Sequence, residues 1–323
     1  MFLLKTLLLA VVLGLSVLSP LSAVGTAEAP KANPKEVNIS WVRSPFNIQV
    51  MVMRDQGLLE KAFAAQGVRV VWHEITSGAQ QTLAMASGSL DIASVVNTSS
   101  LLMANAAGNP VWIIAPVSRP KQTFAVMVNE AGPRDIAQLK GKTVAGPKGT
   151  VLHQILAAGL VSRGLKLEDI NFLNMGLPEA RTALVSGQVD AALQAGALII
   201  RGQESGQRVL FDAEGLVNPL LVSAVRPGFA QAYPHLTELY VKTQVQAARW
   251  ILENPSQALA IGARLQEVSP ADAQKLYRWN GMTQEFTDED REGLRQDLAF
   301  LVQQGMVAAP LDTAKLFWKP GND

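Results

Sequence analysis

Two glycine turns near the middle of the chain carry residue types that bind phosphate or other anions. The first is Gly141-Lys142-Thr143 and the second is Gly146-Pro147-Lys148-Gly149-Thr150. The first resembles the end of a nucleotide-binding P-loop, but that motif needs a glycine where Ile136 stands. It also needs its Lys-Thr pair to open a helix, whereas Thr143 opens a predicted strand. We therefore exclude an ATP site and interpret the first turn as a strand entry.

The second turn follows that predicted strand and opens a predicted helix at Val151. Thr150 is the expected N-cap, and the first amides of a helix have no partner within it. Such an end carries about half a positive charge and binds anions readily, and Gly149 lets a ligand approach the backbone closely. An ordinary capped helix is the alternative interpretation of this turn.

Three further strand-to-helix turns share this character. They are Ser44-Pro45-Phe46-Asn47, Thr76-Ser77-Gly78-Ala79-Gln80 and Asn97-Thr98-Ser99-Ser100. Their Ser, Thr, Asn, Gln and Gly residues offer neutral hydrogen-bond donors rather than catalytic groups. All are predicted at the carboxyl ends of parallel strands, where open α/β sheets bind ligands.

The residues that would carry catalysis or bind a metal are missing. The three histidines, His73, His153 and His235, are scattered, and the chain has no cysteine, no Gly-x-Ser-x-Gly and no conspicuous carboxylate pair. The formal net charge of +1 gives no electrostatic case for nucleic acid. We expect no enzyme activity, no metal and no cofactor.

Strands and helices alternate along the chain, and the rhythm restarts after Arg119. The predicted strands span residues 37–42, 68–74, 91–96, 111–117, 123–128, 143–145, 170–174, 189–194 and 220–225. The predicted helices span residues 47–65, 79–86, 98–107, 151–163, 178–186, 235–253, 256–265, 270–279 and 288–304. Strands separated by helices predict the α/β class with parallel sheets, and the apolar run at 92–96 predicts a strand buried on both faces.

A weak internal repeat accompanies this restart. SGSLDIA at residues 87–93 resembles SGQVDAA at residues 186–192. In both segments a glycine ends a helix and an aspartate precedes a buried strand. The repeat indicates either a common α/β turn used twice or two similar lobes.

The N-terminus predicts export. Lys5 precedes an apolar run at residues 6–18, which is shorter than the roughly 20 residues of a membrane-spanning helix but suits a signal peptide. Small residues follow at Ala23, Gly25, Ala27 and Ala29, so we assign residues 1–29 to a cleaved signal and the protein to the periplasm. An uncleaved membrane anchor is the alternative.

Seven motifs, in order, resemble a known family. They are QGLLEK (56–61), GSLD (88–91), LKGKTVA (139–145), KGT (148–150), LPEA (177–180), GQVDA (187–191) and LFWKP (316–320). Over residues 37–320 the chain resembles the periplasmic substrate-binding proteins of ABC importers, in the group that binds aliphatic sulfonates, taurine and nitrate.

The resemblance implies a type II binding-protein fold, with two α/β lobes that each contain a mainly parallel sheet flanked by helices. The first lobe would comprise residues 36–118 and 218–323, and the second residues 119–217, with the ligand in the cleft between them. Hinge bending at the crossovers near residues 117–122 and 212–218 would close the cleft. The protein, a monomer, would deliver its ligand to an ABC permease in the inner membrane.

By position, the resemblance places ligand contacts at thirteen residues. They are Ser44, Phe46, Asn47, Gly78, Gln80, Asn97, Thr98, Ser99, Lys148, Gly149, Thr150, Gln194 and Trp279. Two departures bear on the ligand: Asn97-Thr98 replaces a frequent Gly-Asp pair, and Gln194-Ala195-Gly196 replaces an aromatic residue followed by Asp-Pro. Losing both acids removes partners for a ligand ammonium and disfavours taurine.

We therefore predict a small organic anion, with an aliphatic sulfonate as first choice, as the ligand of an importer's binding protein. The alternatives are a same-fold binding protein for a neutral heterocycle, such as a pyrimidine precursor, and a periplasmic ligand-sensing partner of a receptor. An enzyme resembling the thiamine-pyrimidine synthases is disfavoured, because the histidine and cysteine clusters of those enzymes are missing.

Export is directly testable. Mass spectrometry of the periplasmic protein should find a mature N-terminus between about Val24 and Lys31, because the small residues there suit signal peptidase. A membrane-bound product that keeps Met1 would contradict the signal-peptide assignment.

Overall fold

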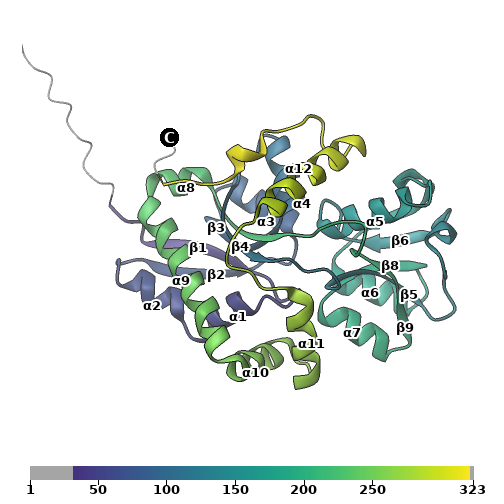
Figure 1. The fold of residues 1–323 in the computed structure, drawn as a ribbon, viewed down its shortest axis with the longest axis horizontal. Helices are drawn as coiled ribbons and strands as arrows, with labels where there is room; N and C mark the ends of the chain where they lie inside the picture. Colours follow the sequence, from purple (N-terminus) through teal and green to yellow (C-terminus); the bar gives the residue numbers. More distant parts are fainter. Residues whose placement is uncertain (1–31, 321–323) are drawn as a thin grey trace, which may run out of the picture. The chain divides into compact units, whose positions relative to one another are not determined.

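A computed structural model describes residues 32–320, so the predicted signal segment lies outside the described residues. Two five-stranded sheets form the framework (Figure 1), with strand orders β2-β1-β3-β10-β4 and β7-β6-β8-β5-β9. The first sheet contains β1 (Glu36–Trp41), β2 (Arg69–Glu74), β3 (Ile92–Asn97), β4 (Trp112–Ser118) and β10 (Leu221–Val225). The second contains β5 (Phe124–Asn129), β6 (Thr143–Gly146), β7 (Asn171–Asn174), β8 (Ala191–Ala195) and β9 (Gln207–Asp212).

Each sheet has four strands that run the same way and one reversed strand. In the first sheet, β1 pairs parallel with β2 and β3, while β10 is antiparallel to β3 and β4. In the second, β6 pairs parallel with β7 and β8, while β5 is antiparallel to β8 and β9. The reversed strand is always the first strand after the chain crosses from the other sheet. The predicted fold of two mainly parallel α/β lobes is confirmed.

The chain crosses between the sheets twice, at residues 119–123 and at residues 213–220. We call the parts built on the first and second sheets the first lobe and the second lobe. The lobe boundaries predicted at residues 118/119 and 217/218 stay a prediction.

Most predicted elements are present within two residues of the expected ends. The longer helices are α1 (Ile48–Asp55), α2 (Leu58–Ala64), α3 (Gly78–Ala86), α4 (Thr98–Ala106), α5 (Val151–Val161), α6 (Leu177–Val185), α7 (Ala197–Glu204), α8 (Pro227–Ala232), α9 (Pro234–Glu253), α10 (Pro255–Gln266), α11 (Pro270–Asn280) and α12 (Asp288–Gln303). Short 3-10 turns add η1 (Ile136–Leu139), η2 (Leu167–Asp169) and η3 (Thr313–Leu316). Among the described residues, no helix is long and apolar enough to span a bilayer.

The structure corrects the sequence interpretation in two places. The single helix predicted at residues 47–65 is divided into α1 and α2, because Gly57 has a φ of +60° that an α-helix cannot continue through. Sequence reasoning also missed α7, β9 and α8. Gly202 and Gly228 weaken the helical signal of α7 and α8, and β9 is only partly buried at one edge of its sheet.

The internal repeat corresponds to one structural device in each lobe. Asp91 Oδ2 accepts a hydrogen bond from the Asn38 amide, 2.9 Å away, and Asp190 Oδ2 accepts one from the Thr143 amide, also at 2.9 Å. Each aspartate thereby ties the entry of an inner strand to the strand beside it, β1 in one lobe and β6 in the other. This equivalence favours two similar lobes over chance reuse of a turn.

The two aspartates differ in burial, which gives a matched test. Asp91 is 8% exposed and pairs with Arg226 at 2.6 Å, whereas Asp190 is 36% exposed and pairs with Lys142 at 3.3 Å. We expect Asp91→Ala to lower the free energy of unfolding by about 3 kcal/mol, because it leaves a half-buried guanidinium unpaired. Asp190→Ala should cost about 1 kcal/mol, since its pair is solvated. Urea denaturation measures both, and equal losses would contradict this account.

Candidate functional site

A small cavity lies where the strand-to-helix turns of both lobes meet. Its volume is about 50 Å³. The polar and turn residues that line this cleft cavity are Ser44, Pro45, Thr76, Ser77, Gly78, Gln81, Asn97, Pro147 and Thr150. They come from the turns that precede α1, α3, α4 and α5 and from the first turn of α3, so the structure brings together all four turns that the sequence singled out.

The side-chain amide of Asn97 joins two helices across this cleft. Asn97 is the N-cap of α4, and its Oδ1 accepts from the Ser100 amide at 2.8 Å. The same oxygen accepts from the Val151 amide, the first of α5, at 3.2 Å. One neutral oxygen of the first lobe therefore satisfies a helix N-terminus in each lobe, at a position where helix ends attract negative charge.

Thr150 precedes α5 as predicted, but its side chain does not cap the helix. The Thr150 hydroxyl donates instead to the Pro147 carbonyl at 2.9 Å, within its own turn. The cap comes from the other lobe, through Asn97. Thr150 therefore occupies the predicted N-cap position but makes no side-chain bond to the helix, and the Val151 amide depends instead on a contact across the cleft.

Two glycines allow the turns to approach each other. A Cβ at Gly78 would lie 2.6 Å from Asn97 Nδ2 and 2.7 Å from the Ser100 hydroxyl, so only glycine fits the start of α3 against the start of α4. Gly149 has a φ of +72°, and a Cβ there would lie 3.7 Å from the Cβ of Ala79. The starts of α3 and α5 therefore face each other closely.

Two more hydrogen bonds hold the lobes together around the cleft cavity. The Ser44 hydroxyl donates to the Ala195 carbonyl at 3.0 Å, and the Ser100 hydroxyl donates to the Gly149 carbonyl at 2.8 Å. Both join a side chain of the first lobe to the backbone of the second. The hydrogen bonds that join the lobes at the cleft cavity are therefore all between uncharged groups.

Several predicted contact residues do not reach the cleft cavity. Phe46 is fully buried against the position of Gly262, where a Cβ would lie 2.3 Å from the Phe46 ring, so it is core. Gln80 is exposed, and the next residue, Gln81, lines the cavity and accepts from the Ser40 hydroxyl at 2.6 Å. Gln80 and Gln81 are neighbours on α3, so their side chains point to different sides of the helix.

Three further residues that were predicted to contact the ligand lie elsewhere or contribute only their backbone. Thr98 and Trp279 line cavities beside the crossovers rather than the cleft cavity. The Lys148 side chain is exposed, and its amide donates to Asn174 Oδ1 at 2.9 Å.

Asn47 and Gln194 are buried beside the cleft residues with one oxygen each unpaired. Asn47 Nδ2 donates to the Pro45 carbonyl at 2.9 Å, and Gln194 Nε2 donates to the Leu177 carbonyl at 3.2 Å. Their side-chain oxygens have no hydrogen-bond partner. Both amides thus support residues that line the cavity, and their role toward a ligand stays a prediction.

Ser99 belongs to a second chain of contacts between the lobes. Its hydroxyl donates to Gln154 Oε1 on α5, and Gln154 Nε2 donates to Asp297 Oδ1 on α12 at 2.7 Å. Asp297 is 9% exposed. Burial raises the pKa of the Asp297 carboxyl to about 7, although the hydrogen bond from Gln154 opposes that shift.

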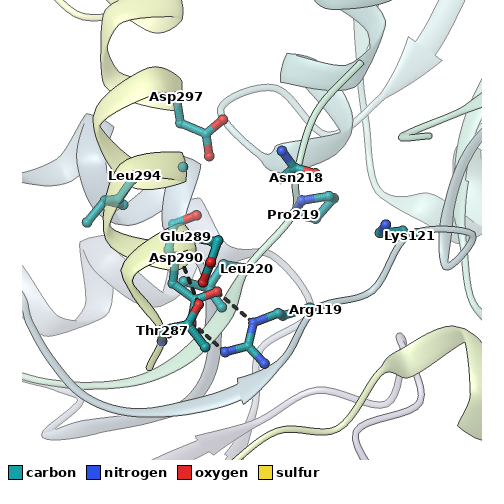
Figure 2. Close-up of a pocket in the computed structure, with 12 residues that line it drawn as sticks. Arg119, Lys121, Asn218, Pro219, Leu220, Thr287, Glu289, Asp290, Leu294 and Asp297 are labelled. Carbon is teal, nitrogen blue, oxygen red and sulfur yellow. Dashed lines mark hydrogen bonds and ion pairs between the residues drawn. The ribbon is translucent and has the colours of Figure 1, made fainter. Parts of the chain in front are cut away.

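A larger cavity, of about 510 Å³, lies between the crossovers and α12, and we call it the crossover cavity. Figure 2 shows Asp297, Asn218 and Lys121 around it, with the Arg119–Asp290 pair at one side. Glu289 and Asp297 both line it. Arg119 is paired with Asp290, and Lys121 faces Glu289 and the partly protonated Asp297, so this cavity offers an anion no net positive charge despite its size.

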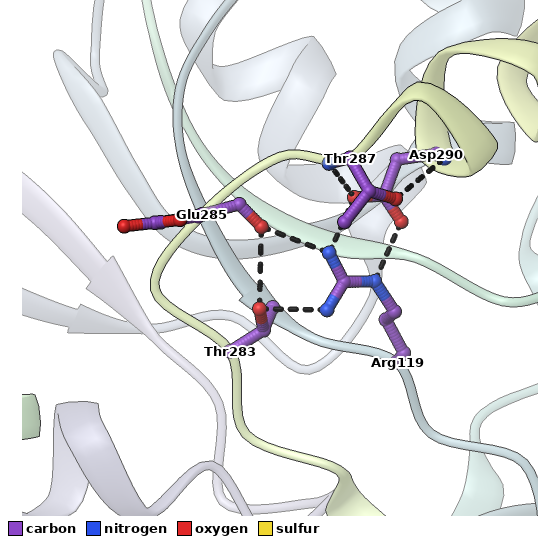
Figure 3. Close-up of polar contacts among 5 residues, drawn as sticks. All are labelled: Arg119, Thr283, Glu285, Thr287 and Asp290. Atoms are coloured by element: carbon purple, nitrogen blue, oxygen red, sulfur yellow. Dashed lines mark hydrogen bonds and ion pairs between the residues drawn. The ribbon is translucent and has the colours of Figure 1, made fainter.

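Arg119, the first residue of the first crossover, is fastened to the start of α12 (Figure 3). Its guanidinium donates to Asp290 Oδ1 at 2.6 Å and to Asp290 Oδ2 at 2.5 Å. It also donates to the Thr283 hydroxyl at 2.7 Å and to the Glu285 carbonyl at 2.8 Å. Burial raises the pKa of Asp290, but the hydrogen bonds from Arg119 and the Thr287 amide outweigh it and hold the pKa below its usual value. The guanidinium is therefore a structural clamp, with four of its five N–H donors already used.

The three histidines lie apart, and each contacts a different residue. His73 and His235 contact Asn38 and Asn33 respectively, each at 2.8 Å. His153 is buried on α5 against Phe172, and burial, reinforced by Lys148, lowers its pKa to about 4. Within the described residues, no three His, Asp or Glu side chains gather as metal ligands would.

The two sheets, their reversed strands and the turns that meet between them define the class of two-lobed periplasmic binding folds. The chain belongs to the NMT1/THI5 like family, whose profile matches residues 61–258.

Relatives and solved structures agree with this class. The chain is 26% identical over 269 residues to the taurine-binding periplasmic protein of Escherichia coli (strain K12), covering 77% of this chain and 82% of the relative. It is 25% identical over 254 residues to a Bacillus subtilis (strain 168) protein named provisionally as aliphatic sulfonates-binding, covering 77% and 76%. The structure of the alkanesulfonate-binding protein SsuA from Xanthomonas axonopodis pv. citri, bound to MOPS, matches with a TM-score of 0.79 at 22% identity. That match covers 89% of this chain and 99% of the other.

The Asp297 pKa predicts a pH-dependent stability. Because the pKa is raised in the folded protein, the ionised carboxylate destabilises the fold above about pH 7, and this penalty disappears as the pH falls toward 4. Asp297→Asn keeps an acceptor for Gln154 and removes the charge. We expect the variant to have a higher Tm than the wild type at pH 8, with a difference that shrinks at pH 5. A difference independent of pH would contradict this assignment.

Proposed function

We propose that this protein is the extracytoplasmic solute-binding component of an ABC importer and binds a small organic anion, above all an aliphatic sulfonate, in the cleft cavity. The observation that carries the proposal is the hydrogen bond from the Val151 amide to Asn97 Oδ1. This helix N-terminus is buried, points into a cleft between lobes, and is capped by a neutral oxygen that a more strongly accepting anion can replace.

The chemistry follows from the helix ends that converge there. An oxygen of the anion takes the place of Asn97 Oδ1 at the Val151 amide, and the starts of α3 and α4 add their partial positive charges. Each partly buried helix end contributes up to about 2 kcal/mol, and each hydrogen bond to a charged group about 1.5–3 kcal/mol. Three helix ends at about 1 kcal/mol each and three hydrogen bonds at about 1.5–2 kcal/mol each thus support binding near −8 kcal/mol, a micromolar Kd.

Entry of the ligand requires the lobes to separate. The cleft cavity of about 50 Å³ has the room of only one or two water molecules, at roughly 30 Å³ each in the liquid. A ligand anchored by the α5 amide and by turns of the first lobe bridges both lobes and favours their closure. Such a ligand-dependent change of shape is what an ABC permease would recognise on a periplasmic, monomeric binding protein.

The relatives support the anion over the neutral heterocycle. Taurine and aliphatic sulfonates, the ligands in the relatives' names, share a sulfonate group. The cleft cavity is lined without a carboxylate or a lysine, as expected where helix dipoles and neutral donors hold an anion. We infer a binding role rather than catalysis, because the relatives are named as binding proteins.

One substitution tests the anion site without changing its shape. Asn97→Asp retains a good N-cap for α4, but it places a carboxylate where the anion must bind. We expect the Kd for methanesulfonate to rise at least about fivefold, because two like charges about 4 Å apart repel by roughly 1–4 kcal/mol. Isothermal titration calorimetry measures the change.

Asn254→Asp, the same chemical change at the N-cap of α10, is the matched control and should bind as the wild type does. In the wild type, a sulfonate at one hundred times its Kd should raise the free energy of unfolding by about 2.7 kcal/mol. If Asn97→Asp binds methanesulfonate within twofold of the wild type, the cleft site is wrong. If only neutral heterocycles stabilise the wild type, the proposal of an anionic ligand is wrong.

A further inference from the structure

A second cavity, of about 340 Å³, adjoins the cleft cavity, and we call it the mouth chamber. Ser44, Thr76 and Leu177 line both spaces, so the two are continuous along one side of the cleft. The chamber is several times larger than the cleft cavity and lies within the roughly 300–1,000 Å³ of small-molecule sites. A ligand whose anionic group sits at the α5 N-terminus therefore has its largest neighbouring space here.

The two lobes give the mouth chamber two different walls. The second lobe contributes apolar residues from the starts of α6 and α7, which are Leu177, Pro178, Ala197 and Leu198. Leu177 and Leu198 are only half-buried, so their side chains have apolar surface left to cover.

The first lobe contributes the charged wall, with Arg43, Glu74 and Glu267. Arg43 and Glu74 pair with each other at 3.4 Å and are 51% and 40% exposed. Together with Arg201 from the second lobe, the chamber has two guanidinium and two carboxylate groups. This balance favours neither a cationic nor an anionic substituent. The substituent that buries most apolar surface against the leucine wall should therefore bind most tightly.

The chamber is also where the lobes meet a second time. Arg201 on α7 donates to the Gln266 carbonyl at the end of α10, 2.9 Å away. The Gln266 side-chain amide in turn donates to the Arg43 carbonyl. These bonds run from the second lobe to the first along the chamber wall, so closing the lobes also encloses whatever the chamber contains.

Resting on the proposed function, we propose that the mouth chamber binds the substituent of the sulfonate, and that this substituent is an apolar chain or ring longer than two carbons. Leu177 and Leu198 set this specificity. A two-carbon amine such as that of taurine leaves the leucines uncovered, and its ammonium meets two guanidinium groups as well as two carboxylates. The preferred ligands are therefore longer alkanesulfonates or arylsulfonates without a charged tail.

A chain-length series tests the proposal. Linear alkanesulfonates from methanesulfonate to octanesulfonate are titrated into the wild-type protein by calorimetry. Each methylene that enters the chamber should tighten binding about fourfold, the equivalent of ~0.8 kcal/mol, until the chamber is filled. Taurine should bind more weakly than butanesulfonate.

Two leucine variants assign the effect to the chamber. Leu198→Asn should reduce the gain per methylene to below twofold, because it replaces the apolar wall by an amide. Leu83→Asn changes an exposed leucine on α3 and should keep the wild-type slope, so it controls for the substitution itself.

The outcomes separate this inference from the function on which it rests. If all sulfonates bind with the same Kd regardless of length, or if Leu198→Asn keeps the wild-type slope, the chamber is not the tail site although the anion site stands. If no sulfonate binds, the proposed function fails and the chamber assignment fails with it.

Discussion

The amide oxygen of Asn97 accepts hydrogen bonds from the first turns of two helices that belong to different lobes. Much of the site follows from this shared cap. It requires glycine at residue 78, because any side chain there would collide with Asn97 and Ser100. It makes the N-terminus of α5 depend on the opposite lobe, since Thr150 donates within its own turn. The neutral oxygen between the two helix ends accepts hydrogen bonds from their amides but brings no negative charge. An anion in the same position would accept hydrogen bonds and also bring the charge.

The paths of the chain between the lobes explain how such a contact can form and separate. Only residues 119–123 and 213–220 connect the two sheets, and Arg119 fastens the first crossover to α12. Hydrogen bonds from Ser44, Ser99, Ser100, Gln154 and Arg201 add to the contacts between the lobes. Such bonds contribute about 1 kcal/mol each, so the proposed ligand, which touches both lobes, would have enough binding energy to favour the arrangement in which they meet.

The sequence predicts the fold and the place of the site better than it predicts the individual contacts. The apolar run of β3, buried at all six positions, and the polar turns after the strands are local signals. The contacts depend on tertiary geometry. Gln81 rather than Gln80 faces the cleft, because neighbouring residues of a helix point about 100° apart. The partner of the α5 amide comes from the other lobe, and no local pattern indicates it. Arg201 and Leu198, which line the mouth chamber, were not predicted because they lie on α7. The sequence of that helix is short and contains a glycine, so it gives only a weak helical signal. Trp279 illustrates the limit of a resemblance by position, since the packing of α11 directs it to another cavity.

The position of the bound anion shows most directly whether the N-terminus of α5 is the binding site. A crystal structure of the wild-type protein with a bound alkanesulfonate, with the sulfur located by its anomalous scattering, would give that position without reference to any variant. We expect a sulfonate oxygen about 3 Å from the Val151 amide nitrogen, with Asn97 Oδ1 displaced from it. A sulfur in the crossover cavity beside Lys121, or a Val151 amide still bonded to Asn97 in the liganded protein, would contradict it.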